Sequence, residues 1–262
     1  MTSRMTMLTM GPIGQLFGLF SILLLVFLLR LIHLIRSTHQ LQSRSQSSGR
    51  LQTCKLTILL GSGGHTGEMI RLLSGLPFDR YTPRTYIISS GDSLSRFKAL
   101  ELERLKQAGQ YEFLEIPRAR RVNQSFVTSI FTTITSLLVC LRFISIKPNF
   151  STCLVTPQED STDEQACSSA VILNGPGSAV PIALSVFLPR LITGKLKPRL
   201  IYVESLARVK KLSLTGILLL PFMDCFIVQW KVLQAEIHRS RLYQVLYRLK
   251  LVSAITFDGW MV

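Results

Sequence analysis

Lys55-Leu-Thr-Ile-Leu-Leu-Gly-Ser-Gly-Gly-His-Thr-Gly-Glu-Met-Ile-Arg-Leu-Leu73 is the stretch from which the fold can be inferred. Its apolar run Leu56–Leu60 predicts a buried strand, and the spacing of apolar residues from Met69 onward predicts a helix. The glycines between them allow a sharp turn and leave no Cβ in the way of a ligand. A strand, a glycine turn and a helix N-terminus together are typical of an anion-binding site, because free N–H groups and the helix dipole converge there.

The turn predicts a site for a phosphate or diphosphate. Its spacing matches neither the dinucleotide-binding pattern nor the P-loop pattern, so neither of those ligand classes is favoured. His65 adds a titratable group at the mouth of the turn and is the candidate catalytic base, with a binding role as the alternative. A tight turn without any ligand is the alternative for the whole site. The residues expected to bind the diphosphate here are Gly61, Ser62, Gly63, Gly64, His65 and Thr66.

Short apolar runs alternate with helical patterns along the rest of the domain. This alternation predicts an α/β fold with a Rossmann-like parallel sheet. The polar segment Asn149–Ser169 predicts an exposed loop insertion. Further strands are expected at Arg84–Ile88, Tyr111–Ile116, Ala170–Leu173, Leu200–Val203 and Phe226–Val228, the last of them closing the sheet. Helices are expected at Ser93–Gln107, at Ser125–Ile146 and from Ala179.

Two further polar motifs follow predicted strands, Asn174-Gly-Pro-Gly177 and Glu204-Ser205. In an open parallel sheet the ligand lies at the carboxyl ends of the strands, so these motifs should share one edge with the glycine turn. Glu204 either accepts hydrogen bonds from sugar hydroxyls, acts as a base, or pairs with Arg208. The residues expected to line the cleft are Asn174, Gly175, Gly177 and Glu204. Arg118, Arg120 and Arg121 follow the third strand and either contact the diphosphate or form a solvated loop.

The composition indicates a membrane partner. The chain has 262 residues and a formal net charge of +15, with 47% hydrophobic residues. Its mean hydropathy, +0.34, is high for a soluble protein of that charge, and membrane contact explains both features. We expect no nucleic-acid binding, because zinc-ligand spacing and RNP-like aromatic motifs are absent. Five scattered cysteines without a C-x-x-C pair are typical of reduced thiols, and we expect neither a metal site nor a cofactor.

The N-terminal segment predicts one transmembrane helix. Residues Leu16–Leu29 carry no charge, and the apolar character from Gly11 to Ile35 suffices to cross a hydrocarbon core of roughly 30 Å. Basic residues follow the span, so the positive-inside rule places the N-terminus in the lumen and the domain in the cytosol. A cleaved signal peptide is the alternative, but its basic cluster would precede the apolar core. We therefore expect an anchor at 1–36, a polar tether at 37–54 and a folded domain at 55–262.

A second apolar stretch, Leu212–Val228, contains Pro221 and Asp224. These interruptions favour a buried helix followed by a core strand over a second transmembrane helix. A helix in the membrane interface is the remaining alternative.

Taken in order, the motifs resemble those of a known family. They are Gly61–Thr66, Ile116-Pro-Arg118, Asn174–Gly177 with Val180-Pro181, Tyr202–Ser205 with Arg208, and Asp224–Trp230. The chain resembles the membrane-anchor subunit of the UDP-N-acetylglucosamine transferase of asparagine-linked glycosylation. The resemblance implies half of a GT-B glycosyltransferase, similar to the acceptor domain of bacterial MurG, whose glycine loop also ends in Gly-Gly-His.

The resemblance also implies a two-chain enzyme. A separate soluble subunit would bind UDP-GlcNAc, and the complex would add the second GlcNAc to GlcNAc-diphosphodolichol on the cytosolic face of the endoplasmic reticulum. This chain would bind the acceptor, recruit the catalytic subunit and be inactive alone. Further implied partners are the first GlcNAc-phosphate transferase of the pathway and the endoplasmic reticulum membrane, with the nuclear envelope as the alternative location.

The length of the chain agrees with a split enzyme, because about one domain's length remains after the anchor and tether. The segment Leu242–Val262 is expected to dock the partner through exposed aromatic residues, Tyr243, Tyr247, Phe257 and Trp260. An ordinary terminal helix and strand is the alternative. A membrane scaffold without a ligand and a complete single-chain glycosyltransferase are the alternative functions.

Overall fold

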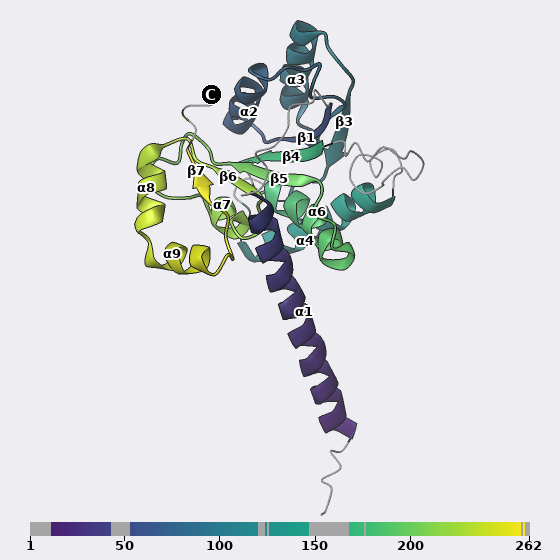
Figure 1. Cartoon of the computed structure of the whole chain (residues 1–262). Helices are drawn as coiled ribbons and strands as arrows, with labels where there is room; N and C mark the ends of the chain where they lie inside the picture. Colours follow the sequence, from purple (N-terminus) through teal and green to yellow (C-terminus); the bar gives the residue numbers. More distant parts are fainter. Residues whose placement is uncertain are drawn as a thin grey trace, which may run out of the picture.

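The computed structural model describes residues 12–42, 53–119, 124, 126–146, 168–175, 177–257 and 259. Over these residues the chain forms a parallel sheet in the order β3-β2-β1-β4-β5-β6-β7, preceded by a long N-terminal helix (Figure 1). The prediction of an α/β, Rossmann-like parallel sheet is confirmed. The strands are β1 (Cys54–Leu60), β2 (Arg84–Ser89), β3 (Tyr111–Ile116), β4 (Ser168–Asn174), β5 (Arg199–Val203), β6 (Cys225–Ile227) and β7 (Ile255–Thr256).

The last strand differs from the prediction. β6 was expected to close the sheet, but β7 pairs with it in parallel, through Phe226 opposite Ile255 and Ile227 opposite Thr256. Two residues are too few to give a recognisable strand pattern in the sequence. The expected insertion Asn149–Ser169 lies outside the described residues, except that Ser168 and Ser169 belong to β4.

Helices cover both faces of the sheet (Figure 1). On one face lie α2 (Gly64–Ser74) and α3 (Ser93–Lys106); on the other lie α4 (Phe126–Ile146), α6 (Ala179–Thr193) and α7 (Leu214–Leu219). Alternate strand residues point to opposite faces. Leu59 of β1 therefore joins the core beneath α4 and α6, while Ile58 and Leu60 join the core beneath α2 and α3. This burial on both sides explains the uninterrupted apolar run of β1.

Two buried ion pairs fix helices to the sheet. Arg84 on β2 pairs with Glu103 on α3 at 2.7 Å, and Arg190 on α6 pairs with Asp224 before β6 at the same distance. The Arg84 guanidinium also donates to backbone carbonyl groups, among them that of Phe78. These bonds compensate the desolvation of the Arg84 charge.

The N-terminal helix α1 (Pro12–Gln42) extends away from the side of the sheet that carries α6 and α7 (Figure 1). Its segment Phe20–Ser37 is long and apolar enough to cross a membrane, and it is the one such helix among the described residues. The helix continues to Gln42, so the first part of the expected tether is helical; residues 43–52 lie outside the described part of the chain.

The end of α1 packs directly against the domain. Leu34 and Ile35 are buried in a cluster with Phe187 and Leu191 of α6. Arg30 donates through Nε to the carbonyl of Leu191 at 3.2 Å. Arg36 donates in the same way to the carbonyl of Leu249 at 3.1 Å. The domain therefore rests on the helix itself.

The stretch Leu212–Val228 forms the expected helix and strand, α7 and β6. Gly216 and Leu219 face the core, as predicted for a buried helix. The opposite side of α7 is exposed at Leu214, Ile217 and Leu218, so the helix is buried on one side only.

Candidate functional site

The glycine turn joins β1 to α2 in an open conformation. Gly63 precedes the helix with φ 67° and ψ −126°, a region that only glycine adopts without strain. A Cβ atom added at Gly63 or Gly64 would meet no other atom within 4 Å. Space for a ligand therefore adjoins the first backbone N–H groups of α2, where the helix dipole favours a negative charge. Ser62 is exposed at the same turn.

The side chain of Thr66 supports this turn from inside. It is buried, and its Oγ1 donates to the carbonyl of Gly61. The same hydroxyl lies 2.6 Å from Ser95 Oγ at the start of α3, and Ser95 is in turn held by Asp92. The glycine turn is thus connected to the neighbouring strand-to-helix turn, and the Thr66 hydroxyl is already engaged.

His65 is fixed by a residue from another strand. Its Nδ1 lies 3.2 Å from Oδ1 of Asn174, the buried last residue of β4. Gly175 follows with φ 73°, and a Cβ atom there would collide with the His65 ring. The predicted meeting of the Gly61–Thr66 and Asn174–Gly177 motifs at one sheet edge is therefore seen in side-chain contacts.

Glu68 connects all three strand-end motifs, although nothing in the sequence pattern singled it out. Its carboxylate accepts from Asn174 Nδ2 at 3.0 Å and from Ser205 Oγ at 2.8 Å. It also lies 3.9 Å from Nδ1 of His65. Glu68 stands three residues after His65 on α2, a spacing that places both side chains on one helix face. That spacing is the signal by which the residue could have been found.

The amide orientation of Asn174 determines the expected tautomer of His65. Because Asn174 Nδ2 donates to the Glu68 carboxylate, its Oδ1 is the atom that faces the imidazole. An amide oxygen can only accept, so this network assigns the single hydrogen of the neutral imidazole form to Nδ1. Nε2 of that tautomer keeps a lone pair and can accept a proton or a hydrogen bond.

Glu204, expected to line the cleft, is fully buried. Its carboxylate accepts from the backbone N–H of Ser205 and from both the N–H and hydroxyl of Ser213, the N-cap of α7. It makes no ion pair with Arg208. Burial, followed by the nearby charge of Glu204, raises the pKa of Tyr202, which contacts Ser213 from the other side. Glu204 therefore fixes α7 to the end of β5 from within the core.

The remaining predicted residues are not part of this cluster. Arg118 is exposed beyond β3, the edge strand, and β2 separates that strand from β1. Arg120 and Arg121 lie outside the described residues. Gly177 is exposed in the turn before α6, with no atom within 4 Å of an added Cβ.

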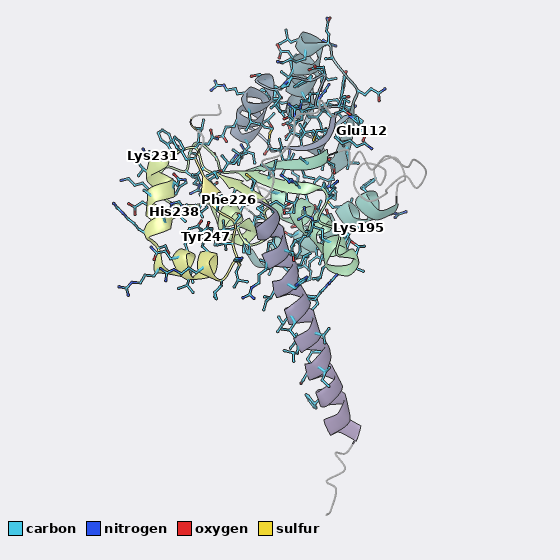
Figure 2. All side chains as sticks on the ribbon, viewed as in Figure 1. Glu112, Lys195, Phe226, Lys231, His238 and Tyr247 are labelled. Carbon is cyan, nitrogen blue, oxygen red and sulfur yellow. The ribbon has the colours of Figure 1, made fainter. Side chains whose placement is uncertain are left out.

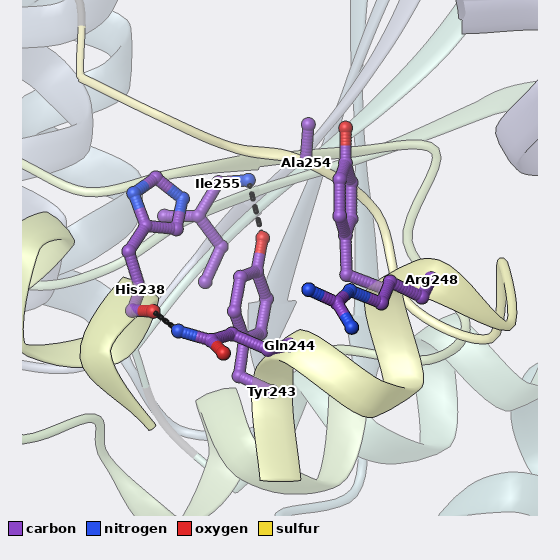
Figure 3. A pocket seen from close by; sticks show the side chains of 7 residues that line it. His238, Tyr243, Gln244, Arg248, Ala254 and Ile255 are labelled. Carbon is purple, nitrogen blue, oxygen red and sulfur yellow. Dashed lines mark hydrogen bonds between the residues drawn. The ribbon is translucent and has the colours of Figure 1, made fainter. Parts of the chain in front are cut away.

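A separate hollow lies near β7, between α8 (Lys231–Arg239) and α9 (Arg241–Arg248) (Figure 3). Its volume is about 390 Å³. Tyr243, expected to be exposed, is instead buried and donates to the carbonyl of Ser253. Tyr247 stacks against Tyr243 with 5.9 Å between the ring centroids, and it remains half exposed. The residues lining the hollow are His238, Tyr243, Gln244, Tyr247, Arg248, Ala254 and Ile255.

A family model described as "Oligosaccharide biosynthesis protein Alg14 like" matches residues 56–246 of this chain. The chain belongs to this Alg14-like family. The matched range runs from β1 into α9, and it contains the glycine turn, Glu68, Asn174 and Ser205. The resemblance inferred from the motifs is confirmed at the level of the family. Because α1 lies outside the matched range, the match to the Alg14-like family comes from the folded domain alone.

Several curated relatives carry the name UDP-N-acetylglucosamine transferase subunit ALG14. The one from Candida albicans is 43% identical over 197 residues, which are 75% of this chain and 80% of the relative. The one from Debaryomyces hansenii is 40% identical over 205 residues, 77% of this chain and 80% of the relative. The one from Mus musculus is 36% identical over 198 residues, 72% of this chain and 81% of the relative. No solved structure matches the chain significantly.

Proposed function

We propose that this chain is the acceptor-binding subunit of a UDP-N-acetylglucosamine transferase and that Gly61–Thr66 holds the diphosphate of the acceptor. The observation that carries the proposal is the open turn at Gly63, beside which His65 is held by Asn174. The names of the Alg14-like relatives support the transferase part. The acceptor is GlcNAc-diphosphodolichol, a lipid whose diphosphate suits backbone N–H groups at a helix N-terminus.

The site divides into backbone and side-chain contributions. The N–H groups at the start of α2 bind the diphosphate. Arg118 lies outside this cluster, beyond β3, and contributes only longer-range positive charge. Nε2 of His65 faces the acceptor and binds it; proton abstraction from the acceptor sugar is the alternative role for this atom. Glu68 and Asn174 hold the imidazole in the orientation that either role requires.

The donor site belongs to a partner subunit. A GT-B enzyme has two Rossmann-like domains facing each other, and the described residues form one sheet. In this proposal a soluble UDP-GlcNAc-binding catalytic subunit supplies the other half and docks at the β7 end of this chain, near Tyr247 and Phe257. This chain recruits that subunit to the membrane that α1 spans, with the N-terminus lumenal and the domain cytosolic. That membrane belongs to the endoplasmic reticulum, and contact with the first GlcNAc-phosphate transferase remains a prediction of the family resemblance.

Gly63→Val tests the diphosphate site. We expect GlcNAc transfer by the reconstituted complex to fall by about 100-fold or more, because the side chain fills the open turn and strains its backbone. Gly91→Val is the matched control: Gly91 also has a positive φ, 78°, and open space around it, but it follows β2. Unchanged transfer by the Gly63→Val complex, with the chain still in the membrane, would exclude the proposed role of the turn.

Assays with and without the donor-binding subunit test the split enzyme. We expect the purified chain to transfer no GlcNAc alone and to do so once the subunit is added. Transfer by the chain alone would instead support a complete single-chain enzyme. Normal transfer after joint replacement of His65, Glu68 and Asn174 by alanine would support a scaffold without a ligand.

A further inference from the structure

Helix α9 carries an exposed apolar stripe on the side facing away from the core. Leu242 and Val245 of α9 and its C-cap residue Leu249 follow one another at spacings of three and four residues, which places them on one face. Their exposed fractions are 70%, 52% and 45%. Tyr243, on another face of the helix, packs toward β7 and fills that side (Figure 3). The stripe therefore has no role in the core.

Helix α7 carries a second exposed apolar face. Leu214, Ile217 and Leu218 are each more than half exposed, while Leu219 on the other side is fully buried. Ile192, in the last turn of α6, is exposed to 82%. Large apolar side chains are thus exposed on three elements on the same side of the sheet.

These elements meet where α1 joins the domain. The carbonyl of Leu249, which ends the α9 stripe, accepts from Arg36 of α1. The carbonyl of Leu191, beside Ile192, accepts from Arg30. Phe222, three residues after α7, packs against the cluster that holds the end of α1. Figure 1 shows α6, α7 and α9 on the side from which α1 leaves, and Figure 2 shows Lys195 and Tyr247 on either side of its base.

The charge around these side chains is positive. Arg241 and Arg248 on α9 are exposed, and so are four lysines in the segments that flank these helices: Lys195 after α6, Lys210 and Lys211 before α7, and Lys250 after α9. The acids between 192 and 257 do not balance them: Glu204 is buried, Asp224 pairs with Arg190, and Glu236 pairs with Arg239 on α8. Each basic residue near an anionic bilayer contributes about 1 kcal/mol of attraction.

We propose that the domain itself rests on the membrane through a basal surface made of Leu214, Ile217, Leu218, Leu242, Val245 and Leu249. Apolar side chains flanked by Lys and Arg are the pattern by which helices bind the lipid interface. The surface adjoins the end of α1, so insertion of α1 into the membrane already places this surface next to the bilayer. Because the surface adjoins α1 and is surrounded by positive charge, we infer that it binds anionic lipid rather than a protein partner. α1 and the basal surface then hold the sheet in one orientation over the membrane.

The test compares two valines of equal exposure in the full-length chain. Val245 lies in the basal surface, and Val232 lies on α8 with an exposed fraction of 51% against 52%. Val245→Cys and Val232→Cys are each labelled with an environment-sensitive fluorophore in nanodiscs that contain doxyl-labelled lipid. The unsubstituted chain, labelled in parallel, gives the background from the native cysteines.

We expect the lipid-borne quencher to quench the label at 245 about threefold more strongly than the label at 232. We also expect quenching at 245 to fall when phosphatidylserine is replaced by phosphatidylcholine and when salt is raised. Equal quenching at the two positions would overturn the proposal. A second result would also overturn the proposal and assign the surface to the partner. In that result the donor-binding subunit protects the label at 245 from aqueous iodide in detergent, and the lipid-borne quencher does not quench that label in nanodiscs.

Discussion

Two glutamates near the same sheet edge, Glu68 and Glu204, have opposite surroundings. Glu68 is partly accessible, with 16% of its side chain exposed, and it joins His65, Asn174 and Ser205 around the glycine turn. Glu204 has no exposed surface and binds Ser205 and Ser213 inside the core. The side chains of the neighbouring residues Glu204 and Ser205 therefore belong to different networks. The network of Glu204 stabilises the fold, and that of Ser205 lies at the proposed ligand site.

This difference shows that a position at the end of a strand does not by itself determine which way a side chain points. The end of a parallel strand brings a residue to the ligand-binding edge, but alternate residues of an extended chain point to opposite sides. Ser205 points toward Glu68, whereas the carboxylate of Glu204 reaches the N-cap of α7. A carboxylate at this edge therefore serves binding only where its side chain keeps access to the solvent.

The largest effect should follow replacement of Glu204 by alanine. Three hydrogen bonds, from the Ser205 N–H and from the N–H and hydroxyl of Ser213, lose their buried acceptor. We expect a loss of about 3–5 kcal/mol in the free energy of unfolding, measured by urea denaturation in detergent. Glu236→Ala, which removes an exposed surface pair on α8, should change that free energy by less than about 1 kcal/mol. A Glu204→Ala chain as stable as the native one would mean that Glu204 is not a structural residue.

Gly175→Ala should have the next largest effect, on the ligand-facing side. The added Cβ collides with the His65 ring, and the positive φ disfavours alanine by about 1–2 kcal/mol. We expect GlcNAc transfer by the complex to fall by roughly 10- to 100-fold, because the imidazole is displaced. Gly75→Ala at the end of α2, where φ is −79° and the nearest atom is 3.8 Å away, should leave transfer unchanged. Equal transfer by the two variants would show that the position of His65 is unimportant.

The sequence was sufficient to predict the parts of the site that depend on local chemistry. The run Leu56–Leu60 and the glycines after it define a strand and an open turn from their own composition. The contacts of Glu68 depend on residues 106 and 137 positions away, so only the order of the strands brings them together. The direction of Glu204 depends in the same way on where Ser213 begins α7. Strand ends were therefore predictable, whereas the partners of the side chains that follow them were not.

A smaller effect is expected for Glu68→Ala. Asn174 and Ser205 lose a shared acceptor, so Asn174 becomes free to rotate and His65 loses its fixed tautomer. We expect transfer to fall by roughly tenfold with a loss of only about 1–2 kcal/mol in stability, because this carboxylate retains access to solvent. Glu68→Gln, which keeps one acceptor oxygen, should recover part of the activity. Glu101→Ala, at an exposed site on α3, serves as the control. A loss of stability as large as that of Glu204→Ala, with normal transfer by the folded fraction, would remove the distinction between the two glutamates.

Ser205→Ala should have the smallest effect. It removes one hydrogen bond to Glu68 at 2.8 Å and leaves the Glu68 contacts with Asn174 and His65 in place. The Ser205 N–H still donates to Glu204, so the buried network is intact. We expect the free energy of unfolding to fall by about 1 kcal/mol and GlcNAc transfer to decrease a few-fold. In the double variant with Glu68→Ala, the Ser205→Ala change should lower stability and transfer almost no further, because the two residues share one hydrogen bond. Additive losses in that cycle would show that Ser205 acts on the site independently of Glu68.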